Sequence, residues 1–185
     1  PIFRDAAGRE RVSAYIEGWR RELVAAGIRV RVDWGQDRPG EKFNRWELKG
    51  VPLRLEVGPR DVDAGQVVLV DRLSSEKRPT PAAGLAERLG DELRAFQAAL
   101  FQRARDFMDQ HTHEVSTLAE LIAHFRDDTG FVWAPWCGSA ECEARVKEET
   151  GGVTIRNFDP DEKPSAGCLV CGRPAVHRVA FARSY

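Results

Sequence analysis

The stretch PGEKFNRWELKGVPLRLEVGPRD, residues 39–61, decides the fold of the first half of the chain. Its first part, residues 41–49, predicts a short helix that ends at Gly50, because glycine commonly follows the last turn of a helix. In residues 53–57 apolar and charged side chains alternate, which predicts a strand with one buried face. Gly58 and Pro59 mark the turn after that strand. A helix that leads directly into a strand indicates a helix packed on a sheet.

The flanking segments continue this pattern on both sides. Residues 9–26 predict an amphipathic helix, residues 28–32 a strand with one buried face, and residues 67–70 a strand buried on both faces. Pro79 and Pro81 mark a joint, after which an apolar stripe that runs to Phe107 predicts a long helix. We therefore predict an α/β fold with a mixed sheet flanked by helices.

The rest of the chain predicts a smaller α+β module. A helix is expected around residues 118–125, a strand at 131–136, a helix that ends near Thr150 and a last strand at 176–181. Residues 157–166 predict an exposed polar loop. We place the boundary inside the long helix, which gives two domains, residues 1–95 and residues 96–185.

Composition and net charge argue against some classes of protein. The chain has 185 residues, of which 31% are charged, and its net charge of -1 argues against a strongly basic nucleic-acid binder but not against a confined basic patch. It contains no apolar run long enough to span a membrane, and a reducing cytoplasmic setting is expected. The start at Pro1, without a methionine, indicates a processed product or an excised segment.

Four cysteines form two close pairs near the end of the chain. They read Cys137-x4-Cys142 and Cys168-x2-Cys171, a spacing typical of a tetrahedral site with four thiolate ligands. Because four ligands fill the coordination shell, we predict a structural Zn²⁺ ion rather than a catalytic one. Two disulfides and four unrelated buried thiols are the alternatives, and the chain shows no secretory signal segment that would favour disulfides.

Residues 39–61 also carry a set of planar and charged groups. Phe43 offers an aromatic ring, Glu47 a carboxylate, and Arg54 and Arg60 offer guanidinium groups. Such groups can stack single-stranded bases and read their edges. Arg72 and Lys77 follow shortly and are candidates for phosphate contacts.

The alternative is that the same residues serve packing and solvation. On that interpretation Phe43, Trp46 and Leu48 are buried, while Arg54 and Glu56 form the solvated face of a strand. From the residues alone, both interpretations stay open.

The sequence resembles a known family in several motifs. Pro39-Gly40, Lys42-Phe43-Asn44, the run from Trp46 to Pro52, and Gly58-Pro59-Arg60-Asp61 are similar to the anticodon-binding domain of prolyl-tRNA synthetases of the archaeal/eukaryotic-like type. That enzyme type also carries a C-terminal zinc-binding domain with the Cys-x4-Cys and Cys-x2-Cys spacing, and it ends in a tyrosine, as this chain does at Tyr185. The resemblance covers nearly the whole chain.

The resemblance implies specific roles. Phe43 would stack on the anticodon, and Glu47, Arg54, Arg60 and Asp61 would lie around the two guanines that proline anticodons share. Tyr185 would lie near the active site of the parent enzyme. The parent would attach proline to its tRNA with ATP and Mg²⁺, as a homodimer, in a catalytic domain for which this chain has no motifs. The chain alone is therefore predicted to be inactive, with no catalytic residue of its own.

Two positions depart from the family pattern. Glu41 stands where an aromatic residue is common, and residues 33–38 differ from the usual acidic run. Two other functions remain open: a zinc-stabilised protein-interaction module, and the anticodon domain of another class II synthetase. The four histidines show no spacing typical of a nucleophilic triad or an open zinc site; they are His111, His113, His124 and His177.

Overall fold

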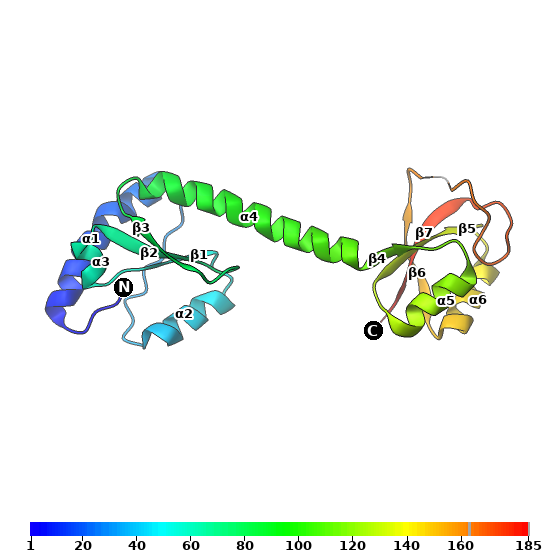
Figure 1. The fold of residues 1–185 in the computed structure, drawn as a ribbon, viewed down its shortest axis with the longest axis horizontal. Helices are drawn as coiled ribbons and strands as arrows, with labels where there is room; N and C mark the ends of the chain where they lie inside the picture. The colour runs from blue at the N-terminus through cyan, green and yellow to red at the C-terminus, as the bar shows by residue number, and fades with distance from the viewer. Residues whose placement is uncertain (163, 185) are drawn as a thin grey trace. The chain divides into compact units, whose positions relative to one another are not determined.

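The computed structural model of the protein describes residues 1–162 and 164–184. The chain divides into two compact units, Pro1–Phe101 and a second unit that begins at Gln102, so the division falls inside one long helix, α4 (Figure 1). The boundary predicted from the sequence, after residue 95, lies earlier in the same helix. The role expected for Tyr185 falls outside the described residues.

The first unit combines helices with a three-stranded sheet. Its elements are α1 (Ala6–Ala25), α2 (Pro39–Leu48), β1 (Leu53–Glu56), α3 (Pro59–Asp63), β2 (Gln66–Asp71), β3 (Lys77–Pro81) and the first part of α4 (Leu85–Gln110). The strand order is β1-β2-β3, and both pairings are antiparallel. Helix α1 begins where the Asp5 carboxylate accepts a hydrogen bond from the Gly8 N–H at 2.7 Å, which caps its first turn.

The two faces of this sheet have different partners. One face contributes Val67 and Leu69 to the core, where they pack with the apolar side of α1 and the start of α4. Arg54, Val70 and Lys77 are register partners across the three strands, so they share the other face. Helix α2 lies on the opposite side of the sheet from α4 (Figure 1).

Two elements of the first unit differ from the prediction. Residues 28–32 are extended but belong to no ladder of the described sheets, because their alternating pattern reflects burial of Ile28, Val30 and Val32 against the core rather than strand pairing. The residues around Pro79 and Pro81, where a joint was expected, form strand β3. The two prolines are tolerated there because β3 is an edge strand.

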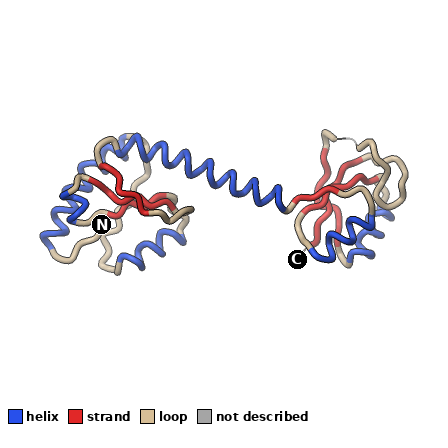
Figure 2. Tube along the Cα trace, in the orientation of Figure 1, coloured by secondary structure: helices blue, strands red, loops and turns tan. Residues whose placement is uncertain are grey.

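The second unit is a small α+β fold. Its elements are β4 (Thr112–Glu114), α5 (Leu118–Asp127), β5 (Phe131–Trp136), α6 (Ala140–Thr150), β6 (Val153–Asp159) and β7 (His177–Arg183). The strand order is β4-β5-β7-β6, with β4 parallel to β5 and the other pairings antiparallel. Figure 2 shows the two separate sheets in red. The α/β prediction is confirmed, but the mixed sheet lies in this unit, whereas it was expected in the first.

The core of the second unit contains two of the four cysteines. Cys142 and Cys168 are buried together with Leu121, Phe125 and Phe181. The predicted polar loop begins later than expected, since residues 157–159 belong to β6. Among the described residues, no helix is both long and apolar enough to cross a membrane.

Candidate nucleic-acid interface and metal centre

A cluster of one aromatic and four charged side chains joins α2 to the sheet. We call it the recognition cluster; its members are Phe43, Glu47, Arg54, Glu56 and Lys77. The Arg54 guanidinium lies 4.1 Å from the centroid of the Phe43 ring, and Lys77 Nζ lies 5.5 Å from it. Four of these residues were predicted as RNA-binding, and folding brings them together from α2, β1 and β3.

Glu56 is the member that the sequence analysis did not assign to a site. Its side chain is only 7% exposed, and it accepts hydrogen bonds from Arg54 Nε at 3.1 Å and from Lys77 Nζ at 2.8 Å. A buried carboxylate requires such partners, because an unpaired buried charge is strongly unfavourable. Glu56 therefore fixes two cations above the Phe43 ring. The sequence contained one indication of this role: Glu56 lies two residues after Arg54, so the two side chains are on the same face of the strand.

Arg54 is shared between two carboxylates. Its NH1 group donates to Glu47 Oε1 while its Nε group donates to Glu56. Glu47 is more exposed than Glu56, at 43% against 7%. An incoming donor can therefore exchange with the Glu47 contact while Arg54 stays held by Glu56.

Arg72 lies beside the recognition cluster. It lines a small hollow that also includes Trp46, Glu47, Pro52 and Arg54. Its Nε atom is buried and has no hydrogen-bond partner among the described residues, and its guanidinium lies 5.6 Å from the Phe96 ring centroid. Within the described residues this Nε donor therefore stays unsatisfied beside the recognition cluster.

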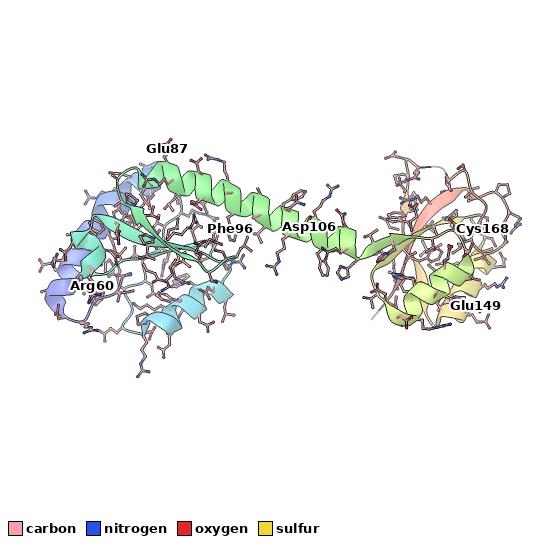
Figure 3. The ribbon with its side chains drawn as sticks, viewed as in Figure 1. Arg60, Glu87, Phe96, Asp106, Glu149 and Cys168 are labelled. Atoms are coloured by element: carbon pink, nitrogen blue, oxygen red, sulfur yellow. The ribbon has the colours of Figure 1, made fainter. Side chains whose placement is uncertain are left out.

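Arg60 and Asp61 lie on α3, which packs against α1 and β2. Figure 3 shows Arg60 beside these elements. The Asp61 carboxylate accepts hydrogen bonds from the Gly58 N–H at 2.8 Å and from Gln66 Nε2 at 3.3 Å. Asp61 thus caps α3. The Gly-Pro-Arg-Asp motif is therefore explained by how it starts this helix.

The segment that departs from the family pattern is tied to α2. Asp33 accepts a hydrogen bond from the Trp46 indole N–H at 2.7 Å, and this contact lowers the pKa of Asp33. Asp37 pairs with Arg45 of the same helix. Glu41 accepts a hydrogen bond from the Arg38 N–H at 3.3 Å, so it closes the first turn of α2.

Leu48 is exposed, whereas the packing interpretation expected it to be buried. It is 81% exposed at the end of α2, whereas Trp46 is half-buried. Leu48 projects from the last turn of a ten-residue helix, and the core of this unit forms on the other face of the sheet. The apolar character of a single residue did not reveal this.

The four cysteines converge in the second unit. All four Sγ atoms lie within 4.8 Å of one another, with Cys137 Sγ 3.6 Å from Cys142 Sγ and 3.7 Å from Cys171 Sγ. A disulfide has a sulfur–sulfur distance of about 2.05 Å, so these thiols are not bonded to each other. Four thiolates at about 2.3 Å from one tetrahedral ion would lie about 3.8 Å apart. The separations therefore fit a metal ion.

Local structure holds each cysteine pair in place. Cys142 lies in the first turn of α6, and the Cys142 N–H donates to the Ser139 carbonyl at 3.2 Å. Cys168 and Cys171 flank a turn in which the Gly172 N–H donates to the Cys168 carbonyl at 2.9 Å. Gly172 has a φ of 69°, which favours glycine at this position.

The thiols differ in their electrostatic environment. A hydrogen bond from the Arg173 guanidinium lowers the pKa of Cys171 to about 6. Burial raises the pKa of Cys142 to about 12. A bound cation would favour the thiolate form of both, and thiolates are the ligands that select zinc.

Comparison with known proteins follows the division of the chain. Residues 3–92 match a family described as an anticodon-binding domain, which is a class of RNA-binding module. Residues 118–185 match a family described as the C-terminal part of prolyl-tRNA synthetase. The chain belongs to the prolyl-tRNA synthetase family and corresponds to these two parts of it.

Relatives from bacteria and archaea agree with this. The chain is 46% identical to a proline--tRNA ligase of Symbiobacterium thermophilum, over 100% of this chain and 38% of the relative. It is 43% identical to a proline--tRNA ligase of Thermococcus kodakarensis, over 94% of this chain and 37% of the relative. A proline--tRNA ligase 2 of Clostridioides difficile is 37% identical over 97% of this chain. The chain thus spans less than half the length of these relatives.

Proposed function

We propose that this chain recognises the anticodon of proline tRNA as part of a prolyl-tRNA synthetase. The parent enzyme would attach proline to tRNA with ATP, in a catalytic domain that lies elsewhere and that uses Mg²⁺. The observation that carries the proposal is the recognition cluster, which places a ring, a carboxylate and two cations on one surface between α2 and the sheet. The family relationship supports the same assignment.

Each side chain has a role in this proposal. Phe43 supplies a ring on which an unstacked base can lie. Glu47 accepts hydrogen bonds from the N1–H and N2–H donors of guanine, and Arg54 donates to its O6 and N7 acceptors. Lys77, with 57% of its side chain exposed, and Arg72 bind phosphate oxygens.

Glu47 and Arg54 bind each other in the free protein, which affects how guanine binds. A guanine has donors for Glu47 and acceptors for Arg54, so it can replace their mutual hydrogen bond with two of its own. Adenine has an amino group where guanine has O6, and it lacks both the N1–H and the 2-amino group. It therefore offers Glu47 neither of these donors and offers Arg54 only N7, which does not compensate for breaking the Glu47–Arg54 hydrogen bond. The discrimination expected for each well-made contact is about 1–3 kcal/mol.

Arg60 and Asp61 take a different part in the proposal. Arg60 is exposed on α3 and is assigned to the RNA backbone. Asp61 already accepts two hydrogen bonds within the domain, so we assign it the positioning of α3 beside the RNA.

We infer that the four cysteines bind a structural Zn²⁺ ion that stabilises the second unit. The donor set and the sulfur separations support zinc, and the free thiols suit a reducing compartment such as the cytoplasm. The protein's own contribution is to hold Cys137 and Cys142 at the start of α6 against the Cys168–Cys171 turn. A homodimeric parent is the state that the family resemblance implies.

Binding to anticodon stem-loops tests the proposal. Fluorescence anisotropy at one fixed salt concentration compares the proline loop with loops in which each shared guanine is replaced by adenine. The proposal expects each replacement to weaken binding by about 5-fold or more. Equal binding of all loops would mean contact with phosphates alone, and a protein-interaction role would then be favoured.

The best variant for this test is Arg54→Lys rather than Arg54→Ala. Lysine keeps a cation beside the buried Glu56 but removes the fork that reads guanine. Arg103→Lys is the matched control, because Arg103 is an exposed cation of α4 outside the recognition cluster.

A further inference from the structure

Three potential metal ligands meet at one end of the second unit, away from the four cysteines. They are His113 of β4, His124 of α5 and Asp128, which follows α5. One ligand atom from each lies within 4.8 Å of the others. The sequence spacing of the histidines gave no indication of this group. His113 and His124 are far apart in sequence, and only the packing of β4 beside the end of α5 brings them together.

The geometry is close to that of a coordinated ion. His113 Nε2 lies 3.9 Å from Asp128 Oδ2, and the centroids of the His113 and His124 rings lie 4.6 Å apart. Ligands at about 2.1 Å from one ion lie about 3.0–3.4 Å apart in octahedral or tetrahedral sites. For the His113–Asp128 pair a movement of about 0.5–0.9 Å would close the difference. The side chains of His113 and Asp128 are 40% and 55% exposed, so an ion can reach them from solvent.

The backbone already holds the three ligands in place. The Thr129 N–H donates to Asp128 Oδ1 at 2.7 Å, which leaves Oδ2 facing His113. The Thr129 carbonyl lies 3.3 Å from His124 Nε2, where it can accept the N–H of a ligated imidazole. The Phe131 N–H donates to the His111 carbonyl at 2.9 Å, which closes the loop after α5 against β4.

Gly130 makes this closure possible. It has a φ of 105°, and a Cβ atom there would lie 2.3 Å from the His111 carbonyl oxygen. Only glycine allows the loop to approach β4 this closely. The spacing between Asp128 and His113 therefore depends on an approach that no other residue permits.

We propose that His113, His124 and Asp128 bind a divalent transition-metal ion. Two imidazoles and one carboxylate suit zinc, nickel, cobalt or iron(II) rather than magnesium or calcium, which prefer oxygen ligands alone. Three protein ligands leave coordination positions for water or for a side chain of a partner. The bound ion would join the C-terminal end of α5 to β4.

This site is separate from the four-cysteine centre. The Leu118 N–H, at the start of α5, donates to the Leu169 carbonyl next to Cys168, whereas His124 and Asp128 lie at the other end of the helix. A helix of ten residues is about 15 Å long, so the two sites cannot share an ion. Figure 3 places Cys168 at the end of the unit away from β4.

Calorimetric titration with Ni²⁺ tests the proposal on the full chain after its cysteine site is loaded with zinc. Nickel is the probe because imidazole and carboxylate ligands suit it, whereas thiolates retain zinc. One saturable event per chain is expected in the original protein. His124→Gln and Asp128→Asn should each weaken it at least about tenfold. Asparagine keeps an oxygen that accepts from the Thr129 N–H, so Asp128→Asn should fold normally.

His111→Gln and His177→Gln are the matched controls. The His111 ring stacks on Phe107, with centroids 4.1 Å apart, and its Nδ1 lies 2.7 Å from the Phe107 carbonyl oxygen. Both controls should bind nickel as the original protein does. Paramagnetic broadening of amide NMR signals should be strongest in residues 111–114 and 124–130 and in residues 131–133, which pair with β4. Absence of saturable binding, unchanged binding in the two test variants, or an equal loss in the controls would each overturn the proposal.

Discussion

Replacing Glu56 by glutamine tests whether this buried carboxylate organises the recognition cluster. Glutamine keeps the shape of the side chain and one acceptor oxygen, but it removes the charge that pairs with Arg54 and Lys77. The two cations would then lie over the Phe43 ring without the anion that holds them. We expect loss of stability in the first unit together with weaker and less selective binding of the proline stem-loop.

The magnitude follows from the exposure of the two pairs. Lys77 is 57% exposed, so solvent screens its pair with Glu56 and that pair contributes about 0–1 kcal/mol. Arg54 is 18% exposed, and a hydrogen bond to a charged group at such a site contributes about 1.5–3 kcal/mol. Because glutamine retains one acceptor, we expect a net loss of about 2 kcal/mol. For a unit of this size that lowers the melting midpoint by about 8–16 °C.

The assay is urea unfolding followed by tryptophan fluorescence. Trp133 and Trp136 belong to the second unit, so replacing both by phenylalanine leaves a signal from the first unit alone. Glu76→Gln is the matched control, because Glu76 is exposed in the connection before β3 and the charge change is the same. If Glu56→Gln unfolds at the same urea concentration as this control, Glu56 does not have the organising role that we assign to it.

Three further predictions concern other parts of the chain. Gly130→Ala should destabilise the second unit by about 1–3 kcal/mol more than Gly151→Ala, since both have positive φ but only Gly130 faces a clash, and urea midpoints compare them. Trp46→Phe should reduce stability at neutral pH but less so in acid. The hydrogen bond lowers the pKa of Asp33 in the folded state, so its stabilisation is present above the usual pKa of aspartate and is lost as pH falls through the folded value, which a pH series of midpoints measures. Chelation of zinc should remove amide-exchange protection from residues after about 130 and leave β1–β3 protected, whereas uniform protection with and without chelator would contradict the zinc assignment.

The elements with clear periodicity could be predicted from sequence. Val12, Ile16, Trp19 and Leu23 repeat at helical spacing and are buried on α1 as expected. The cysteine spacing predicted that the four thiols come together, because each pair brings its two sulfurs close through a local turn. Helix α1 and each cysteine pair carry their signal within a short segment of the chain.

Features that arise from contacts between distant segments could not be predicted. Alternation in residues 28–32 indicated burial correctly but not the missing ladder partner. Glu56 looked like a solvated residue, because its burial depends on Lys77 from β3. The approach of His113 to His124 likewise depends on how β4 packs beside the end of α5.

The central claim is that Glu47 reads guanine, and a base lacking the 2-amino group tests it most directly. Binding of the original chain and of Glu47→Ala is measured on proline stem-loops in which each shared guanine is kept or replaced by inosine. We predict that the original chain prefers guanine by about 5- to 150-fold at one of the two positions, and that Glu47→Ala loses this preference while it still binds the loop. An undiminished preference for guanine in Glu47→Ala would contradict the account.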